Sequence, residues 1–261
     1  MIPALAAAFI FLSVAMAAAW AVRWINGNSG WIDTIWTFSV GAAAAIALTL
    51  LPADGARRVL LAGLVGIWSM RLGFHMLART RRTSDDPRYA GLIEQWGRSA
   101  PLRLFLFLQI QALAGFVLVA AVALAADSTA PATSWGTMAF AALAIASVVG
   151  EGIADAQLEA CKREKSPGGI CESGLWVWSR HPNYFFEWLH WLAIALIAIC
   201  PATSALSWAA LAAPAMMYLL LRYGSGVPHI ELHMQRTRPA AFADYAKRVP
   251  VFFPRLWKAR E

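Results

Sequence analysis

Long apolar segments without charge are the feature that most constrains how this chain can fold. Residues 2–22, 104–126 and 135–150 contain no Asp, Glu, Lys or Arg. A helix needs roughly 20 such residues to cross the hydrocarbon core of a bilayer. Because that core offers no water, a crossing backbone must satisfy its own hydrogen bonds, as a helix does. The sequence therefore predicts an all-α fold, a polytopic membrane helix bundle.

The composition agrees with lipid as the solvent. Apolar residues make up 59% of the 261 residues and charged residues 14%, against about 45–50% and 25% in soluble domains. Arg23 follows the first apolar segment and no basic residue precedes it, so we interpret this segment as a retained helix and not as a signal peptide. We expect a single integral membrane domain over 1–261 with about seven spans: 2–22, 31–51, 59–78, 104–126, 135–150, 184–200 and 207–221.

The basic residues are unevenly distributed over the connections between these spans. Connections on one side carry only Arg57 and Arg58, whereas those on the other side carry nearly all the remaining Lys and Arg residues. Connections rich in Lys and Arg stay in the cytoplasm during insertion. We therefore expect the N-terminus outside and the C-terminus in the cytoplasm. The polar segments 79–103, 151–180 and 222–261 then share the cytoplasmic side, where a polar ligand would bind.

The net charge and the cysteines indicate no further partner. Positive-inside bias and contact with anionic membrane lipids account for the charge of +7, and we expect no nucleic acid. Cys161, Cys171 and Cys200 have neither CxxC spacing nor a nearby pair of histidines. The first two lie in a segment predicted to be cytoplasmic, where disulfides are rare. We expect three free thiols and no metal.

A polar stripe lies within the third predicted span. Trp68, Arg71, His75 and Arg79 are spaced three, four and four residues apart, which places them on one face of a helix. An arginine inside a span costs roughly 2.5–3.5 kcal/mol and usually faces the bundle interior. The alternative is snorkelling toward the membrane surface, which suits Arg79 better than the deeper Arg71. We expect Arg71 to contact a ligand.

Two other polar sets allow more than one interpretation. Asp33 opens the second span beside Trp31 and Trp36, and either a pocket or an interfacial aromatic belt with a hydrated carboxylate explains it. A second helical stripe requires no more than ion pairs on a solvated face, at about 0.2–0.5 kcal/mol each. It consists of Asp155, Glu159 and Lys162 or Arg163.

The segment 174–191 carries the strongest signal for a ligand site. Pro182 suits the first turn of a helix, so we expect the sixth span to begin there. Arg180 and His181 then lie at a helix N-terminus, where backbone N–H groups favour an anion. One face continues into the membrane with Asn183, Tyr184 and Glu187. A helix cap with an interfacial tyrosine is the alternative, but it does not explain a glutamate one turn inside.

These residues resemble the C-terminal signature of the membrane steroid 5-alpha-reductase family, in its bacterial branch known as DUF1295. The matching residues are Gly174-Leu-Trp, Ser-Arg-His-Pro-Asn-Tyr184, Glu187 and Trp191. Segments 66–75, 86–97 and 245–254 resemble other parts of the family, and the resemblance is strongest over 66–254. Sterol delta-14 and delta-7 reductases and isoprenylcysteine carboxyl methyltransferases share the C-terminal pattern, so it marks a superfamily and not one reaction.

The resemblance implies a seven-helix bundle, in a bacterial inner membrane, with its active site toward the cytoplasm. It further implies NADPH-dependent reduction of the C=C bond of an enone, in a steroid-like or isoprenoid lipid that enters from the bilayer. Matched by position, the cofactor-contacting residues fall on Arg71, His75, Arg79, Arg82, Asp155, Lys162, Asn183 and Glu187. The same signature contains Arg180, His181 and Tyr184, and the last contacts are expected at His229 and Glu231.

The sequence departs from the family at the residues that hold the 3-keto oxygen of the substrate. Eukaryotic members use a Glu and a Tyr, but here the Tyr position falls on Trp68 and the Glu position within 33–36. Negative charge that develops on the carbonyl oxygen needs a hydrogen-bond donor, and the hydride must come from a cofactor. The candidate catalytic residues are Asp33, Trp36, Trp68 and Tyr89.

Three functions remain open at this point. The first is the NADPH-dependent enone reductase. The second is an S-adenosylmethionine-dependent methyltransferase acting on an isoprenylcysteine or a lipid, whose cofactor has little use for Arg71. The third is a seven-span receptor or carrier, which the scarcity of polar residues in the outer half disfavours. We favour the reductase because arginines bind the phosphate groups of NADPH in a bidentate manner.

Overall fold

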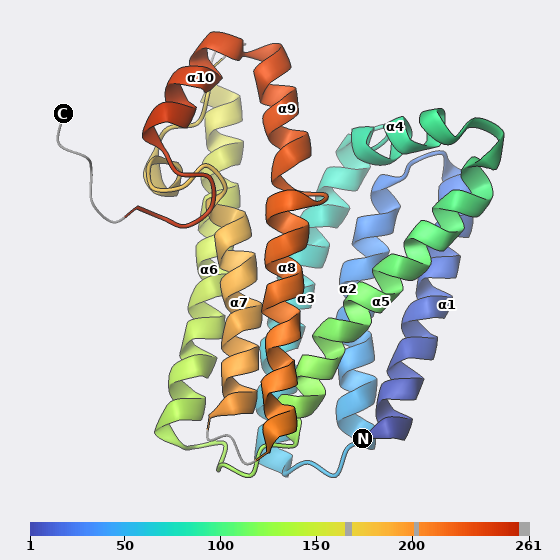
Figure 1. The fold of residues 1–261 in the computed structure, drawn as a ribbon, viewed down its shortest axis with the longest axis vertical. Helices are drawn as coiled ribbons and strands as arrows, with labels where there is room; N and C mark the ends of the chain where they lie inside the picture. Colours follow the sequence, from blue (N-terminus) through green and yellow to red (C-terminus); the bar gives the residue numbers. More distant parts are fainter. Residues whose placement is uncertain (165–168, 201–203, 256–261) are drawn as a thin grey trace. The chain divides into compact units, whose positions relative to one another are not determined.

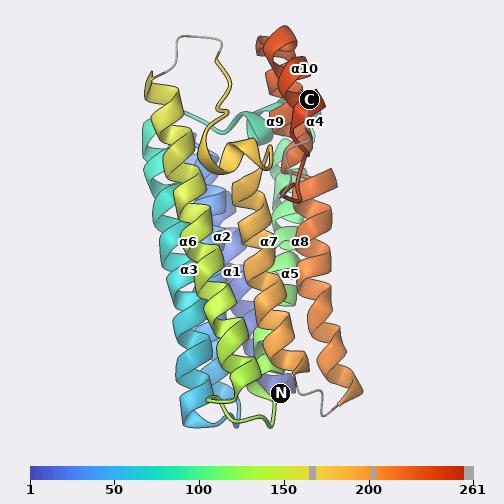
Figure 2. The same ribbon diagram turned by 90° about the vertical axis from the view of Figure 1, so that its left-hand side faces the viewer.

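The computed structural model describes residues 1–164, 169–200 and 204–255, and every regular element within them is a helix. The prediction of an all-α, polytopic membrane bundle is thereby confirmed (Figures 1 and 2). The helices divide into two compact units. The first comprises Met1–Ala141 with the described part of Ile194–Ala213, and the second comprises the described part of Ala142–Ala193 with the described residues from Pro214 onward.

The first unit is built mainly from four long helices and one short one. The long helices are α1 (Ile2–Asn26), α2 (Gly30–Leu50), α3 (Gly55–Arg82) and α5 (Ala100–Ala126). The short helix α4 (Pro87–Trp96) lies at the end of the unit where α1 finishes and α2 begins (Figure 1). The 3-10 helices η1 (Gly97–Ser99) and η3 (Ala205–Leu211) complete it.

Small residues let these helices approach closely. The buried face of α1 repeats about every fourth residue through Ala4, Ala8 and Leu12. Between α2 and α3, a Cβ added at Gly41 would lie 2.3 Å from the Ser69 Oγ atom. No larger residue fits there without displacing a helix. Small residues at such contacts are typical of membrane helices, since lipid supplies no hydrophobic force to press helices together.

Arg57 is buried at the opposite end of the same unit from α4. Its side chain is 1% exposed. Nη1 donates to the carbonyl oxygen of Ala125 at 3.0 Å, and Nη2 donates to that of Ala130. These carbonyls end α5 and follow it, where helix carbonyls lack partners within the helix. Arg57 therefore joins the start of α3 to the end of α5.

The second unit contains the other helices. They are α6 (Trp135–Glu164), α7 (Pro182–Ile199), α8 (Ala212–Tyr223), α9 (Val227–Thr237), α10 (Pro239–Arg248) and the 3-10 helix η2 (Gly174–Val177). The first residues of α6 and of α8 and the last residues of α7 belong to the first unit. Figures 1 and 2 both show α6, α7 and α8 side by side, with α9 and α10 continuing beyond α8.

Six helical segments among the described residues are long and apolar enough to cross a membrane: Ile2–Asn26, Gly30–Leu50, Gly55–Arg82, Pro87–Ala126, Trp135–Arg163 and Ala205–Thr237. The predicted span 184–200 corresponds to α7, which has 18 residues and is not among the six. Its polar residues Asn183, Glu187 and His190 lower its average apolarity. The orientation of the chain in the membrane and the single-domain organisation stay predictions.

The expectation of three free thiols is wrong. Cys161 and Cys171 form a disulfide, with their Cα atoms 5.5 Å apart, and Cys200 alone is free. The prediction rested on the reducing character of the expected compartment and not on geometry. The fold brings residue 171 back against the end of α6, which the sequence spacing does not reveal.

Candidate functional site

The start of α4 organises the polar end of the first unit. The Asp86 carboxylate accepts the backbone N–H of Arg88, and Pro87 occupies the first turn. An Asp cap followed by Pro is a strong helix start. The next residues, Arg88 and Tyr89, therefore have fixed directions on a short helix. Tyr89 is 3% exposed.

Tyr89 and Asp33 form the centre of a hydrogen-bonded network. The Tyr89 hydroxyl donates to Asp33 Oδ1 at 2.8 Å and accepts from Gln111 Nε2 at 2.7 Å. Arg88 forms an ion pair with Asp33 Oδ2. Trp36 Nε1 donates to the backbone carbonyl of Gln111 at 2.9 Å. Three of the four candidate catalytic residues thus share one network, which fixes the phenol proton toward a carboxylate.

The fourth candidate, Trp68, lies elsewhere in the same unit. Its side chain is fully buried on α3. The stripe to which it belongs runs outward along α3, because Arg71 and His75 are half-buried while Arg79 and Arg82 are exposed. The stripe therefore leads from the protein interior to the polar end of the unit.

A second carboxylate, Asp86, joins this stripe to the network. Asp86 Oδ2 lies 2.9 Å from Arg79 Nη2 and 2.9 Å from Arg88 Nη2. Burial opposes ionisation of Asp86, but the hydrogen bonds and charge of Arg88, with the charge of Arg79, outweigh it and hold the pKa of the carboxyl below its ordinary value. Asp86 therefore carries a negative charge at neutral pH.

Two features of this end bear on the binding of water or a ligand group. A cavity of about 10 Å³ has room for about one water molecule. It is lined by Gly30, Asp33, Met76, Arg79, Thr80, Thr83 and Asp86. In addition, the Gln111 Oε1 atom is buried and has no hydrogen-bond partner among the described residues. A buried acceptor of this kind usually has a partner, so a donor from a ligand or water suits this position.

In the second unit, Asp155 and Asn183 meet directly. Asn183 Nδ2 donates to Asp155 Oδ1 at 3.1 Å, joining α6 to the first turn of α7. One turn further, Glu187 is 5% exposed and accepts from Trp191 Nε1 at 3.0 Å. Lys162 pairs instead with Glu159 at 2.8 Å on an exposed surface, as expected for a solvated helix face.

Arg180 and His181 contact an anion supplied by the chain itself. Glu231 Oε1 lies 2.8 Å from Arg180 Nε and 3.2 Å from His181 Nε2. The His181 ring also stacks on Tyr184, with 5.5 Å between ring centres. Burial lowers the pKa of His181 although the carboxylate of Glu231 acts in the opposite direction. His229, on the same helix as Glu231, is exposed.

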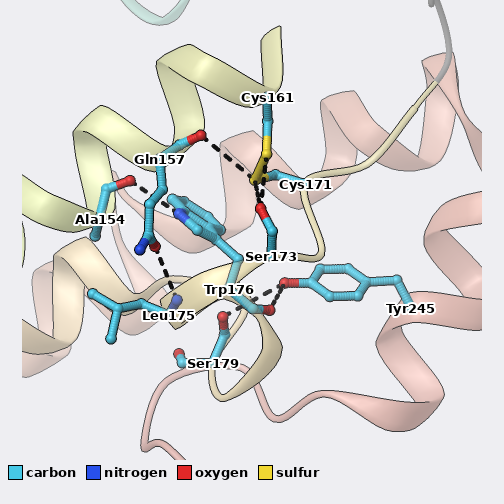
Figure 3. The surroundings of a disulfide bond; sticks show 9 residues. All are labelled: Ala154, Gln157, Cys161, Cys171, Ser173, Leu175, Trp176, Ser179 and Tyr245. Carbon is cyan, nitrogen blue, oxygen red and sulfur yellow. Dashed lines mark hydrogen bonds between the residues drawn. A yellow bond between two sulfur atoms is a disulfide. The ribbon is translucent and has the colours of Figure 1, made fainter. Parts of the chain in front are cut away.

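Much of the signature 174–184 has a partner within its own unit (Figure 3). Gly174 has a positive φ of 59°, and a Cβ there would lie 2.3 Å from the side chain of Gln157. Ser179 Oγ donates to the Phe252 carbonyl at 2.8 Å, and Tyr245 Oη donates to the Trp176 carbonyl at 2.7 Å. These residues hold the loop before α7 in place.

Sequence reasoning did not assign Asp86, Arg88 or Gln111 to the site. Asp86 and Arg88 lie in the segment 86–97, which resembles the family, and Arg88 is one of the basic residues of a connection, but no role in the site is predicted for either, although Asp86-Pro-Arg is a helix start. Gln111 is one of two polar side chains in the apolar segment 104–126. An amide in such a segment indicates an interhelical hydrogen bond, and on this ground Gln111 could have been identified from the sequence.

Comparison with known proteins assigns the chain to a family. No curated protein and no solved structure matches the chain. The family described as "Protein of unknown function (DUF1295)" matches residues 19–249, which include both the network of Asp33 and the signature before α7. The chain therefore belongs to the DUF1295 family.

Proposed function

We propose that this protein reduces the C=C bond of an enone in a steroid-like or isoprenoid lipid, with NADPH as the hydride donor. The observation that carries the proposal is the Tyr89–Asp33 hydrogen bond, supported by the amide of Gln111. The resemblance to steroid 5-alpha-reductases leads one to expect a tyrosine and a carboxylate at the substrate carbonyl. Tyr89 and Asp33 provide such a pair, although the family's tyrosine position falls on Trp68 and not on Tyr89.

The chemistry places a specific demand on Tyr89. Addition of hydride to the β-carbon of an enone moves an electron pair onto the carbonyl oxygen, and a hydrogen-bond donor must stabilise that charge. The Tyr89 hydroxyl can turn from Asp33 to the carbonyl oxygen, while Gln111 continues to donate to it. Asp33 then keeps its ion pair with Arg88. A proton added to the α-carbon completes the reduction.

The residues present suit the cofactor. NADPH carries a pyrophosphate and a 2′-phosphate and supplies the hydride when bound. In the first unit, the exposed Arg82 and the half-exposed Arg79 present guanidinium groups that match phosphate oxygens. In the second unit, the amide of Asn183 beside Asp155 offers the mixed donors and acceptors that polar groups of a nucleotide need. Arg180 fits less well, because Glu231 and two backbone carbonyls occupy its Nε and Nη1 donors.

Thermal stability of the purified protein in detergent tests the cofactor. We expect NADPH to raise the melting temperature more than NADH does, because only NADPH has a 2′-phosphate. Arg82→Ala should weaken NADPH binding roughly tenfold, about 1.4 kcal/mol, whereas the exposed Arg98→Ala should not. If S-adenosylmethionine stabilises the protein and NADPH does not, the methyltransferase function replaces this proposal.

Turnover of a 3-keto-Δ4 steroid tests the role of Tyr89. We expect Tyr89→Phe to reduce NADPH-dependent turnover by about 10²–10³-fold, as for loss of one oxyanion donor, while NADPH still raises the melting temperature. Trp96→Phe, also on α4, is the matched control and should retain turnover. Full turnover by Tyr89→Phe would exclude the phenol as the donor.

A further inference from the structure

We propose that the Cys161–Cys171 disulfide is a site of reversible thiol–disulfide exchange that determines how firmly the segment 171–183 is held to α6. This inference does not depend on the reductase function. The disulfide joins the end of α6 to the residues before η2, across 10 residues of sequence. Lys162, Arg163 and Arg180 lie in the same stretch, which the positive-inside rule assigns to the cytoplasm. In that compartment disulfides are generally redox-active and not structural.

The surroundings of the two sulfur atoms suit both oxidation states (Figure 3). Ser173 Oγ lies 3.3 Å from Cys161 Sγ and 3.7 Å from Cys171 Sγ. A disulfide sulfur carries no proton, so the Ser173 hydroxyl is the donor. Such a donor stabilises a departing thiolate, and a leaving thiol of lower pKa leaves faster.

The reduced state also has a partner in place. The backbone carbonyl of Gln157 lies 3.8 Å from Cys171 Sγ. A disulfide cannot donate to that carbonyl, but the thiol of reduced Cys171 can. Ser173 is exposed on the surface next to the two buried sulfurs, so a small thiol can approach from its side.

The exchange is a two-electron transfer from a dithiol. A thiolate of the reductant attacks one sulfur of the disulfide, forms a mixed disulfide with it and releases the other cysteine as a thiolate. The second thiol of the reductant then attacks the mixed disulfide. Cys161 and Cys171 end as thiols with two added protons, and the reductant ends as a disulfide.

The mechanical effect follows from the bonds that surround the disulfide. Gln157 Oε1 accepts the backbone N–H of Leu175 at 2.9 Å, and Trp176 Nε1 donates to the Ala154 carbonyl at 3.0 Å. These bonds survive reduction, but without the covalent link they open more often. Asp155 lies on α6 between these attachment points, and its partner Asn183 is the last residue of the tethered segment 171–183. Reduction therefore loosens the Asp155–Asn183 contact.

Hydrogen exchange of the purified full chain, with and without dithiothreitol, tests the inference. We expect 1 mM dithiothreitol to reduce the disulfide without denaturant and to speed exchange of the Leu175 and Trp176 amides roughly tenfold. Cys161→Ser should exchange like the reduced protein, and Cys200→Ser, at the free cysteine, like the untreated parent. Ser173→Ala should slow reduction severalfold and leave exchange of the oxidised protein unchanged.

Three results would overturn the proposal. The disulfide could resist dithiothreitol until the protein unfolds, which is the behaviour of a structural disulfide. Reduction could proceed without any change in exchange of residues 174–183. Acid trapping of thiols in intact cells could show the pair permanently oxidised. The measurements on the parent protein remain decisive even if Cys161→Ser does not fold, and none of them requires NADPH or a substrate.

Discussion

The network around Asp33 and the loop before α7 are both polar, and each lies at the start of a helix whose first residue is a proline. Their polar groups differ in the partners that they contact. In the loop, Ser179 and Arg180 donate to backbone carbonyls of the same unit, and the loop carbonyl of Trp176 accepts from Tyr245 on α10. Around Asp33, charged side chains face one another, and the buried oxygen of Gln111 has no hydrogen-bond partner among the described residues. The comparison teaches that much of the most recognisable sequence signature holds the fold, while a cluster of charged side chains and a buried oxygen without a partner among the described residues lie outside it.

Loss of Arg88 should produce the largest effect and would show how far the Asp33 network depends on charge balance. Arg88→Met leaves Asp33 and the buried Asp86 with one cation fewer. Asp86 keeps its ion pair with Arg79, whereas the part-buried Asp33 keeps only the hydrogen bond from Tyr89. Breaking a buried ion pair by removing one partner is costly, and we expect destabilisation of about 3 kcal/mol. Unfolding by sodium dodecyl sulfate in mixed micelles measures it. Arg98→Met is the exposed control, and adding Asp33→Asn should restore part of the loss.

Substitution of Gly174 should have a smaller effect and would test whether the loop is held by its backbone. Gly174→Ala meets both a positive φ and the side chain of Gln157. We expect destabilisation of about 1–3 kcal/mol. Gln157→Ala loses its own hydrogen bond to Leu175, but Gly174→Ala should cost less in the Gln157→Ala background than in the parent, because the clash is absent there. Gly63→Ala on α3, where no atom lies within 4 Å of the added Cβ, is the control. It should be neutral or stabilise the protein by up to about 1 kcal/mol. Equal effects at both glycines would refute this view of the loop.

Acidification should have the smallest effect and should separate the two regions. The pKa of His181 is lowered by burial, so the folded protein keeps the ring neutral while the unfolded chain binds a proton. Stability is therefore lost as the pH falls below about 6.5, the ordinary pKa of histidine. We expect a loss of stability between pH 7 and pH 5 that disappears in His181→Gln but persists in His229→Gln.

Asp86 should respond only at lower pH. Its pKa lies below the ordinary value, so its contribution is complete above about pH 4 and is lost as the pH falls further. Asp86→Asn should therefore leave the dependence of stability on pH between pH 7 and pH 5 unchanged. If that dependence vanished in Asp86→Asn, Asp86 and not His181 would be the group that titrates in this range.

The fold was predictable because the uncharged segments leave the backbone few alternatives in lipid. The helical stripe of α3 and the start of α7 at Pro182 also have a local basis, since helical spacing and a proline start are visible in sequence, whereas the contact of Asp155 with Asn183 joins residues 28 positions apart. The partners of Asp33 are not visible in this way, because they lie 55 and 56 residues away. The same holds for Glu231, which follows Arg180 by 51 residues. The disulfide was not predicted because the expectation rested on the reducing character of the cytoplasm. Whether two cysteines can pair depends on the path of the chain, which places Cys171 beside Cys161.

The buried Arg57 is synthesised well before the groups to which it donates hydrogen bonds. Its acceptors, the carbonyls of Ala125 and Ala130, are 68 and 73 residues further along the chain, so the ribosome makes α3 well before the groups that will bind its guanidinium. Burying an arginine without hydrogen-bond partners is expensive. We therefore expect the guanidinium of Arg57 to stay in contact with water or lipid headgroups until the end of α5 has been made. A chain released before residue 130 would retain an exposed cation where the finished protein has Arg57 bound to two carbonyl oxygens.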